Sequence, residues 1–137
     1  MDSKMNDRLN AIPEHPFHQF LGVTSITSDK GCGALSVTLT ENVINSAGIL
    51  HGGAIYVLCD VCAYGGLVSL LDENTAAVTH DIQISVMRSA RLGDVVDFRS
   101  EVVKMGKSVC FIDVKVTVSG EIIASARVIK TIRKARQ

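Results

Sequence analysis

A run of about twenty residues, from Gly52 to Leu71, carries a single charged side chain, that of Asp60. An apolar run of this length would suffice to span a bilayer. However, an Asp at the centre of a membrane helix costs about 2.5–3.5 kcal/mol, and no basic anchors flank the run. The strand-like runs that follow offer burial against protein instead. The sequence therefore predicts a buried central helix, apolar on nearly all sides because protein surrounds it.

Alternation of apolar and polar residues on both sides of this helix predicts β-strands. Before the helix, Leu35, Val37 and Leu39 alternate with hydroxyl side chains. Four alternating runs follow it, at 82–86, 96–102, 112–118 and 124–129. Turn sequences at 92–94, 105–107 and 119–120 separate these runs, and short connections favour antiparallel neighbours. The predicted fold class is α+β, with an antiparallel sheet of five or six strands around one long helix.

The chain has 137 residues, which fit one ordinary domain. We expect residues 1–20 to form an N-terminal tail and a short helix, and residues 21–137 to form the domain itself. Hydrophobic residues make up 47% of the chain and charged residues 20%, which is typical of a packed core rather than of a disordered segment. Met1 to Asn10 are polar and charged, with no apolar signal region, so we expect a cytoplasmic protein.

Charge and aromatic content argue against nucleic acid or an anionic membrane as a partner. The 14 Lys and Arg residues balance 14 Asp and Glu residues, whereas such partners usually go with a basic excess. Trp is absent and aromatic residues make up 4%, so a base-stacking platform is not expected. No dense cluster of His, Cys and Asp appears in the sequence, and we expect neither a metal nor another cofactor.

Cys59 and Cys62 form a CxxC pair inside the apolar run, which raises redox and zinc chemistry as alternatives. A zinc site would need a second pair of ligands at a compatible spacing, and none follows. A reactive CxxC lies at a helix N-terminus, where the helix dipole lowers the thiol pKa, whereas this pair lies within the helix. The sequence therefore predicts buried, unreactive thiols.

Asp60 is the strongest candidate for chemistry because a carboxylate in apolar surroundings loses hydration that other contacts must offset. At 100° per residue, Tyr56 and Tyr64 share its face of the helix. Two interpretations stay open. Asp60 is either a structural residue bonded to a tyrosine hydroxyl or a backbone group, or a catalytic residue.

His51-Gly52-Gly53 directly precedes the predicted helix. The first amides of a helix lack an internal acceptor and lie at the positive end of its dipole, so they could bind a carbonyl oxygen that gains negative charge. The glycines could equally terminate a loop. Asn45, six residues before His51, could orient water or substrate, or could cap its own loop.

His51 and Asp60 are nine residues apart, which corresponds to 900° of rotation and roughly 13 Å along a helix. They therefore lie on opposite faces. If both serve one reaction, we expect them to come from different subunits of a homodimer.

The ordered pattern Asn45-(x)5-His51-Gly52-Gly53-(x)6-Asp60 resembles the signature of hotdog-fold acyl-CoA thioesterases of the phenylacetate-degradation type. Weaker similarities extend over about residues 16–132, at Pro16-Phe17, Leu21-Gly22, residues 78–91, Leu92-Gly93-Asp94 and Gly106-Lys107-Ser108. Ser89 departs from the pattern, because many relatives have proline there.

The resemblance implies a hotdog thioesterase domain over residues 21–137, assembled as a dimer or as a tetramer of two dimers. It implies that Asp60 activates water or attacks the thioester carbonyl, and that the Gly52 amide holds the carbonyl oxygen. Asn45 and His51 would position substrate or water. Thr79 falls where relatives often carry a hydroxyl that orients the water.

The predicted function is hydrolysis of acyl- or aryl-CoA thioesters to free acid and CoA, without a cofactor. Candidate substrate-binding residues are Gly53, Tyr56, Tyr64, Arg88 and Lys107. Arg91 and Lys104 could also attract CoA, although each of these basic side chains could simply be a solvated surface charge. The alternatives are a hotdog enoyl or hydroxyacyl dehydratase and a non-catalytic hotdog protein that binds acyl-CoA.

Overall fold

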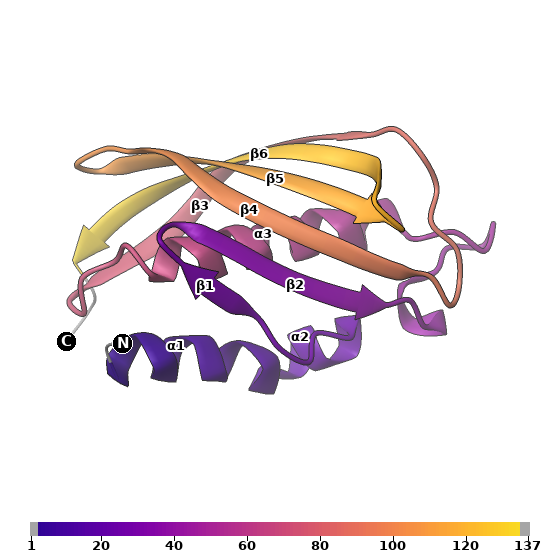
Figure 1. Cartoon of the computed structure of the whole chain (residues 1–137), viewed down its shortest axis with the longest axis horizontal. Coiled ribbons are helices and arrows are strands. Elements are labelled where there is room, and N and C mark those ends of the chain that lie inside the picture. The colour runs from indigo at the N-terminus through magenta and orange to yellow at the C-terminus, as the bar shows by residue number, and fades with distance from the viewer. Residues whose placement is uncertain (1–2, 135–137) are drawn as a thin grey trace.

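The computed structural model describes residues 3–134 as two short N-terminal helices, a central helix and one six-stranded sheet. In chain order the elements are α1 (Ser3–Glu14), α2 (Pro16–Leu21), β1 (Thr27–Asp29), β2 (Cys32–Thr38), the 3-10 helix η1 (Glu41–Val43), α3 (Gly52–Val68), β3 (Thr75–Val86), β4 (Val95–Met105), β5 (Val109–Val118) and β6 (Glu121–Lys134). Figure 1 shows the curved sheet over α3, with α1 and α2 along the lower side of the molecule. The predicted α+β architecture is confirmed.

The helix α3 is the apolar run, and it is buried on most of its surface as predicted. Its buried residues include Leu58, Val61, Leu67 and Val68, which pack into the single core. Strand residues such as Phe98 and Ile112 cover it from the sheet side. No helix among the described residues is long and apolar enough to cross a membrane.

The N-terminal segment differs from the predicted tail, because residues 3–14 form α1. Leu9 and Ile12 of this helix are buried in the same core as α3. Only these few apolar residues mark α1 in a polar sequence that also contains Pro13, which is why periodicity does not reveal it. The expected short N-terminal helix is present as α2, which ends at Leu21.

The strand order is β1-β2-β4-β5-β6-β3, and all neighbours are antiparallel. Tight turns join β4 to β5 and β5 to β6 as expected. The predicted turn at 92–94 lies between β3 and β4, but these two strands do not pair with each other. Instead, β3 pairs with β6 and forms one edge of the sheet. Three strand spacings separate β3 from β4, about 14 Å, which the eight residues between them can span. The hydrogen bonds between Leu39 and both Gly93 and Asp94 fix the turn beside β2.

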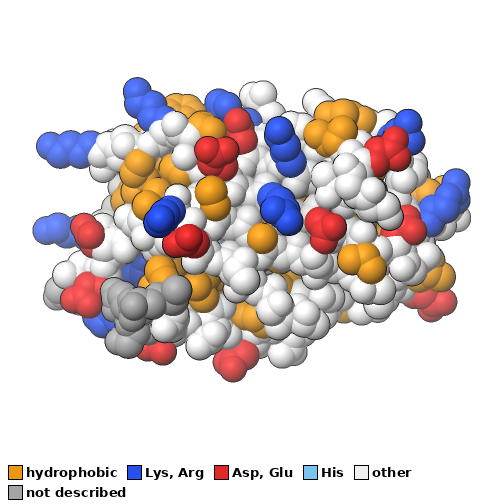
Figure 2. Space-filling view, in the orientation of Figure 1, with side chains coloured by type: hydrophobic (Ala, Val, Ile, Leu, Met, Phe, Trp, Pro, Cys, Tyr) orange, Lys and Arg blue, Asp and Glu red, His pale blue; other side chains and the backbone are white. Residues whose placement is uncertain are grey.

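Charged side chains of both signs are interspersed over the face shown in Figure 2, and apolar side chains there form small patches. This surface agrees with the balanced charge of the sequence.

Two glycines let the helix approach the sheet closely. A Cβ added at Gly33 in β2 would lie 2.6 Å from the backbone nitrogen of Gly66 in α3, and one added at Gly66 would lie 2.8 Å from that of Gly33. Ser100 of β4 reinforces the contact, because its buried hydroxyl donates to the Cys62 carbonyl at 2.8 Å. Backbone atoms cannot move aside as a flexible side chain can.

We expect Gly33→Ala to destabilise the protein by about 1–3 kcal/mol, because the added methyl group forces the helix backbone away from the sheet. Thermal or denaturant unfolding followed by circular dichroism measures the change. Gly52→Ala is the matched control, since its added Cβ meets nothing within 4 Å and should leave stability near that of the wild type. Equal stability of the two variants would contradict the close-contact argument.

Burial of the CxxC cysteines agrees with the predicted unreactive thiols. Burial, together with the smaller effects of the neighbouring Cys62 and Asp60, raises the pKa of Cys59 to about 12. Burial also raises the pKa of Cys62 to about 11 against the opposing effect of its Ser100 contacts. Burial raises the pKa of Cys110 as well. Cys32, in contrast, is exposed.

At pH 8 we expect a thiol reagent to label Cys32 rapidly and the other three cysteines only after unfolding. At that pH roughly one Cys59 thiol in ten thousand is the reactive thiolate when its pKa is about 12. Mass spectrometry of the labelled peptides makes the measurement, and Cys32→Ala, which should lose the rapid phase, is the control. Rapid labelling of Cys59 or Cys62 in the folded chain would restore the redox interpretation of the CxxC.

Candidate active site

Asp60 projects from α3 toward the paired strands β3 and β6, where it meets Thr79 and Lys130. Thr79 Oγ1 donates to Asp60 Oδ1 at 2.5 Å. Lys130 Nζ donates to the same Oδ1 at 2.9 Å and to Thr79 Oγ1 at 2.5 Å. Thr79 and Lys130 are opposite one another in the β3–β6 register, so both side chains point to the same face of the sheet. We call these three residues the Asp60 cluster.

The surroundings of Asp60 differ from those expected from the sequence. Its side chain is 40% exposed rather than fully buried, whereas the Lys130 side chain is 3% exposed. Its bonded partners are Thr79 and Lys130 rather than a tyrosine hydroxyl or a backbone group. The sequence thus identifies the carboxylate but not the charge that accompanies it.

A β-bulge at His80 brings Thr79 to this position. The register shifts between Thr79 and Asp81. Because of this extra residue, Thr79 points to the same side of the sheet as Ile82 and Ile84, although regular alternation would turn it to the other side. Without the bulge, Thr79 would share the outward face with Asp81. The His80 side chain contacts the Thr131 hydroxyl at 2.8 Å beside this irregularity.

The Asp60 cluster lines a cavity of about 280 Å³. The other residues that line it are His18, Val61, Tyr64 and Ala77. Tyr64 is therefore near Asp60 as predicted, while Tyr56 is an exposed residue outside this lining. No pattern in the sequence singles out His18. Its Nδ1 lies 2.8 Å from the Ile12 carbonyl oxygen, and because a carbonyl only accepts, this nitrogen carries the proton.

The N-terminus of α3 carries the second group of predicted site residues. His51 is the N-cap, and its Nδ1 accepts a hydrogen bond from the Gly53 amide at 2.9 Å. Nδ1 is therefore unprotonated and Nε2 carries the proton in the neutral ring. Gly52 follows as the first helical residue, with open space at its Cβ position. This leaves the Gly52 amide at the positive end of the helix dipole, next to solvent.

Asn45 acts as a cap of its own loop. Its Oδ1 accepts hydrogen bonds from the amides of Ala47 and Ile49, at 2.9 and 3.3 Å. The oxygen of this side chain is thus committed to loop structure, and its amide NH₂ is the part that could contact a substrate.

A smaller hollow of about 200 Å³ opens beside the α3 N-terminus. It is mostly apolar and is lined by Phe17, Leu21, Asn42, Val43, Ile44, His51, Gly53, Ala54 and Val57. It shares no lining residue with the cavity at Asp60. Within one chain, Asp60 and Thr79 therefore face one hollow, and His51 and Gly53 face another.

The predicted CoA-binding residues Arg88 and Lys107 lie at opposite ends of the sheet. The Arg88 amide bonds to the Ile123 carbonyl, whereas Ser108, next to Lys107, accepts from the Ile132 amide. Nine residues of β6 separate these points, roughly 30 Å along a strand. Arg88 is also paired with Glu121 at 2.8 Å. One chain does not bring Arg88 and Lys107 to the same group of a ligand.

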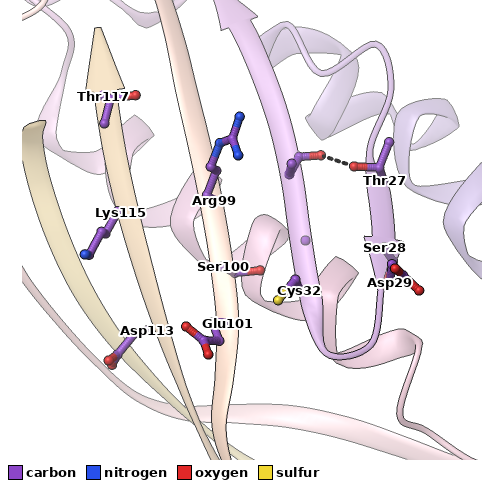
Figure 3. Close-up of a pocket in the computed structure, with 12 residues that line it drawn as sticks. Thr27, Ser28, Asp29, Cys32, Arg99, Ser100, Glu101, Asp113, Lys115 and Thr117 are labelled. Carbon is purple, nitrogen blue, oxygen red and sulfur yellow. Dashed lines mark hydrogen bonds between the residues drawn. The ribbon is translucent and has the colours of Figure 1, made fainter. Parts of the chain in front are cut away.

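A further hollow, of about 630 Å³, contains none of the predicted site residues. It lies on the face of the sheet turned away from α3, where side chains of β2, β4 and β5 project, among them Arg99, Glu101, Asp113 and Lys115 (Figure 3). Among residues 3–134, no group of three or more His, Cys, Asp or Glu side chains could hold a metal ion.

Comparison with known proteins connects this arrangement to a family. Residues 47–131 match the thioesterase superfamily. Acyl-coenzyme A thioesterase 13 of Homo sapiens is 29% identical over 114 residues, which are 81% of each chain. The structure of smu.793 from Streptococcus mutans UA159 bound to acetyl CoA has a TM-score of 0.74 at 25% identity, over 85% of this chain and 90% of that one. Thioesterase HI1161 of Haemophilus influenzae has a TM-score of 0.84 at 18% identity, over 96% and 92%.

A long apolar helix wrapped by a six-stranded antiparallel sheet is the hotdog fold of these thioesterase structures. The chain belongs to the thioesterase superfamily, a class of hydrolases that act on thioester bonds. Its assignment to the phenylacetate-degradation type within that superfamily stays a prediction.

Proposed function

We propose that this protein hydrolyses acyl-CoA or aryl-CoA thioesters to the free acid and CoA, with Asp60 as the catalytic carboxylate. The observation that carries the proposal is the Asp60 cluster, in which a partly exposed carboxylate is oriented by a hydroxyl and an ammonium group at the wall of a cavity. Two relatives support the substrate class: one is named an acyl-coenzyme A thioesterase, and one structure is bound to acetyl CoA.

The chemistry needs only groups that the chain supplies. A thioester carbonyl is electrophilic, so a positioned carboxylate together with an oxyanion site suffices for its hydrolysis. Asp60 either removes a proton from the attacking water or attacks the carbonyl carbon itself. In the first route the C–S bond breaks and the proton held by Asp60 passes to the CoA sulfur. In the second route CoA leaves as the thiolate, and water then hydrolyses the acyl–Asp60 anhydride to the free acid and regenerates the carboxylate. Thr79 holds the carboxylate and lies where it can also orient the water.

We assign the oxyanion site to the Gly52 amide. A helix N-terminus favours negative charge, and the open space at Gly52 lets a carbonyl oxygen approach. The Nε2 proton of His51 and the NH₂ group of Asn45 are further donors at this end of the helix. The mostly apolar hollow that Phe17, Leu21 and Val57 line together with His51 and Gly53 would accommodate an acyl group.

We further propose that each active site combines two chains of a homodimer. Asp60 lines one hollow of the chain, whereas His51 and Gly53, the two neighbours of Gly52, line another, so a second copy is needed to bring Asp60 and the Gly52 amide to one carbonyl. The long edge strand β3 provides a contact surface: it has twelve residues, and its Val78 and Val86 are 46% and 51% exposed. A long, unprotected edge strand tends to pair with another chain, whereas the other edge, β1, has only three residues.

We expect wild-type protein to hydrolyse members of a panel of short, medium, long and aryl-acetyl CoA esters, and Asp60→Asn to lower kcat about 100-fold or more. Asn is nearly isosteric with Asp but neither accepts the proton nor attacks well. Release of CoA followed with a thiol reagent gives the rates. Asp72→Asn, at an exposed position after α3, is the matched control and should match wild type. A folded Asp60→Asn variant with wild-type kcat would refute the catalytic role.

Tight binding of acyl-CoA by the wild-type protein without any turnover would favour the non-catalytic alternative.

The shared site predicts complementation between inactive variants. Asp60→Asn removes the carboxylate, and Asn45→Asp removes the NH₂ donor while keeping the oxygen that caps the loop. Each is expected to be nearly inactive alone. After unfolding and refolding together, about half of the dimers are heterodimers with one intact site, which restores about a quarter of wild-type activity.

If all site residues came from one chain, every site in the mixture would carry a lesion. A mixture no more active than its components, with heterodimers present by mass spectrometry, would therefore exclude the shared site.

A further inference from the structure

Lys130 occupies a position in β6 that the sequence pattern reserves for apolar side chains. Ala124, Ala126 and Val128 alternate toward α3, and Lys130 continues that alternation as a buried residue. Burying an ammonium group costs several kcal/mol unless other groups replace its hydration. Both groups that bond to Lys130 Nζ, the Asp60 carboxylate and the Thr79 hydroxyl, belong to the proposed reaction site.

The direction of each hydrogen bond in the Asp60 cluster follows from the chemistry of lysine. An ammonium only donates, so Thr79 Oγ1 accepts from Lys130 and directs its own proton to Asp60 Oδ1. Oδ1 therefore receives two donors, one from the hydroxyl and one from the ammonium. Both donors bond to the same oxygen, which fixes the carboxylate plane and leaves Oδ2 as the oxygen for water or substrate.

The aromatic ring of Tyr64 helps to hold the ammonium in place. Lys130 Nζ lies 5.8 Å from the centre of that ring, within the range of a cation–π contact. Tyr64 and Lys130 line the same cavity as Asp60. The ammonium of Lys130, which extends from β6, is thus held by Thr79 of β3 and by Asp60 and Tyr64 of α3.

We propose that Lys130 is a positioning residue of the thioesterase reaction, which holds the Thr79 hydroxyl and the Asp60 carboxylate so that Oδ2 is the reactive oxygen. This inference rests on the proposed function. Lys130 acts through its two partners and need not touch the substrate.

A purely structural ion pair is the competing explanation, and the geometry makes it the weaker one. An ion pair between a buried ammonium and a partly exposed carboxylate adds little net stability to the fold. An apolar side chain of similar length at the same position often stabilises a protein equally well. The preceding inward residues of β6, Ala126 and Val128, are apolar and belong to the core. The feature that an apolar residue cannot reproduce is the pair of hydrogen bonds to Asp60 and Thr79.

The test compares Lys130→Met with wild type on the best CoA ester of the panel. We expect kcat to fall about 10- to 100-fold, as for misplacement of a catalytic group, with KM changed less than about twofold. Lys115→Met, at an exposed position of β5 on the other face of the sheet, is the matched control and should retain wild-type kcat. Thermal unfolding of each variant establishes that the rates refer to folded protein. If Lys130→Met does not fold, Lys130→Gln, which also lacks the ammonium, undergoes the same comparison.

A second comparison, in the Asp60→Asn background, asks whether Lys130 acts through Asp60. Because the group that it positions is already absent, Lys130→Met should lower kcat by less than about twofold there. The same large factor in both backgrounds would overturn the inference. A folded Lys130→Met or Lys130→Gln variant with wild-type kcat would overturn it as well. A wild-type protein that hydrolyses no ester overturns the proposed function and this inference with it, whereas an active wild type with an equally active Lys130→Met overturns this inference alone.

Discussion

The burial of α3 is the constraint on which the rest of the structure depends. A helix that is apolar on nearly all sides can leave little of its surface in water. The sheet therefore curves over it and α1 covers another side, and only the face that carries Gly53, Tyr56 and Asp60 stays partly exposed. Full burial of one large apolar side chain contributes about 1.5–3 kcal/mol, and α3 supplies several. The Gly33–Gly66 contact then fixes how closely β2 and α3 approach, which sets the position of the helix beneath the sheet.

The same constraint determines where the charge of Asp60 can be accommodated. The sheet covers α3 mainly with β2 and β4, and the strands β3 and β6 pass the helix near one edge of the sheet. Asp60 points to that edge, where its carboxylate keeps partial contact with solvent and receives its two donors. A carboxylate on the opposite side of α3, among Leu58 and Cys62, would lose its hydration without any such replacement.

Much of the fold follows from sequence periodicity, because it depends on repeated apolar positions. The central helix, the strands on either side of it and two of the tight turns are predicted by these patterns. The pairing of β3 with β6 is not, since local alternation contains no information about which strand lies at which edge. Periodicity also does not predict the helix α1, because only a few of its residues, among them Leu9 and Ile12, are buried.

The site shows a similar division between local and long-range information. The pattern from Asn45 to Asp60 lies on one continuous segment, so the sequence predicts those residues directly. The inward position of Thr79 depends on the bulge at His80, and it was anticipated only through family resemblance. Lys130 is 70 residues from Asp60, although extending the apolar alternation of β6 by one step would have marked it as a buried lysine.

The separation of the two hollows gives the edge strand β3 a role beyond stability. A helix dipole is useful for an oxyanion only at its N-terminus, whereas Asp60 must lie two turns further along, where β3 and β6 supply its donors. One helix cannot present both groups to a single carbonyl. In our proposal a second copy resolves this conflict, because a two-fold axis brings the N-terminus of one α3 to the middle of the other. The same pairing would cover exposed apolar side chains of β3, so that one contact both protects the edge strand and completes two active sites.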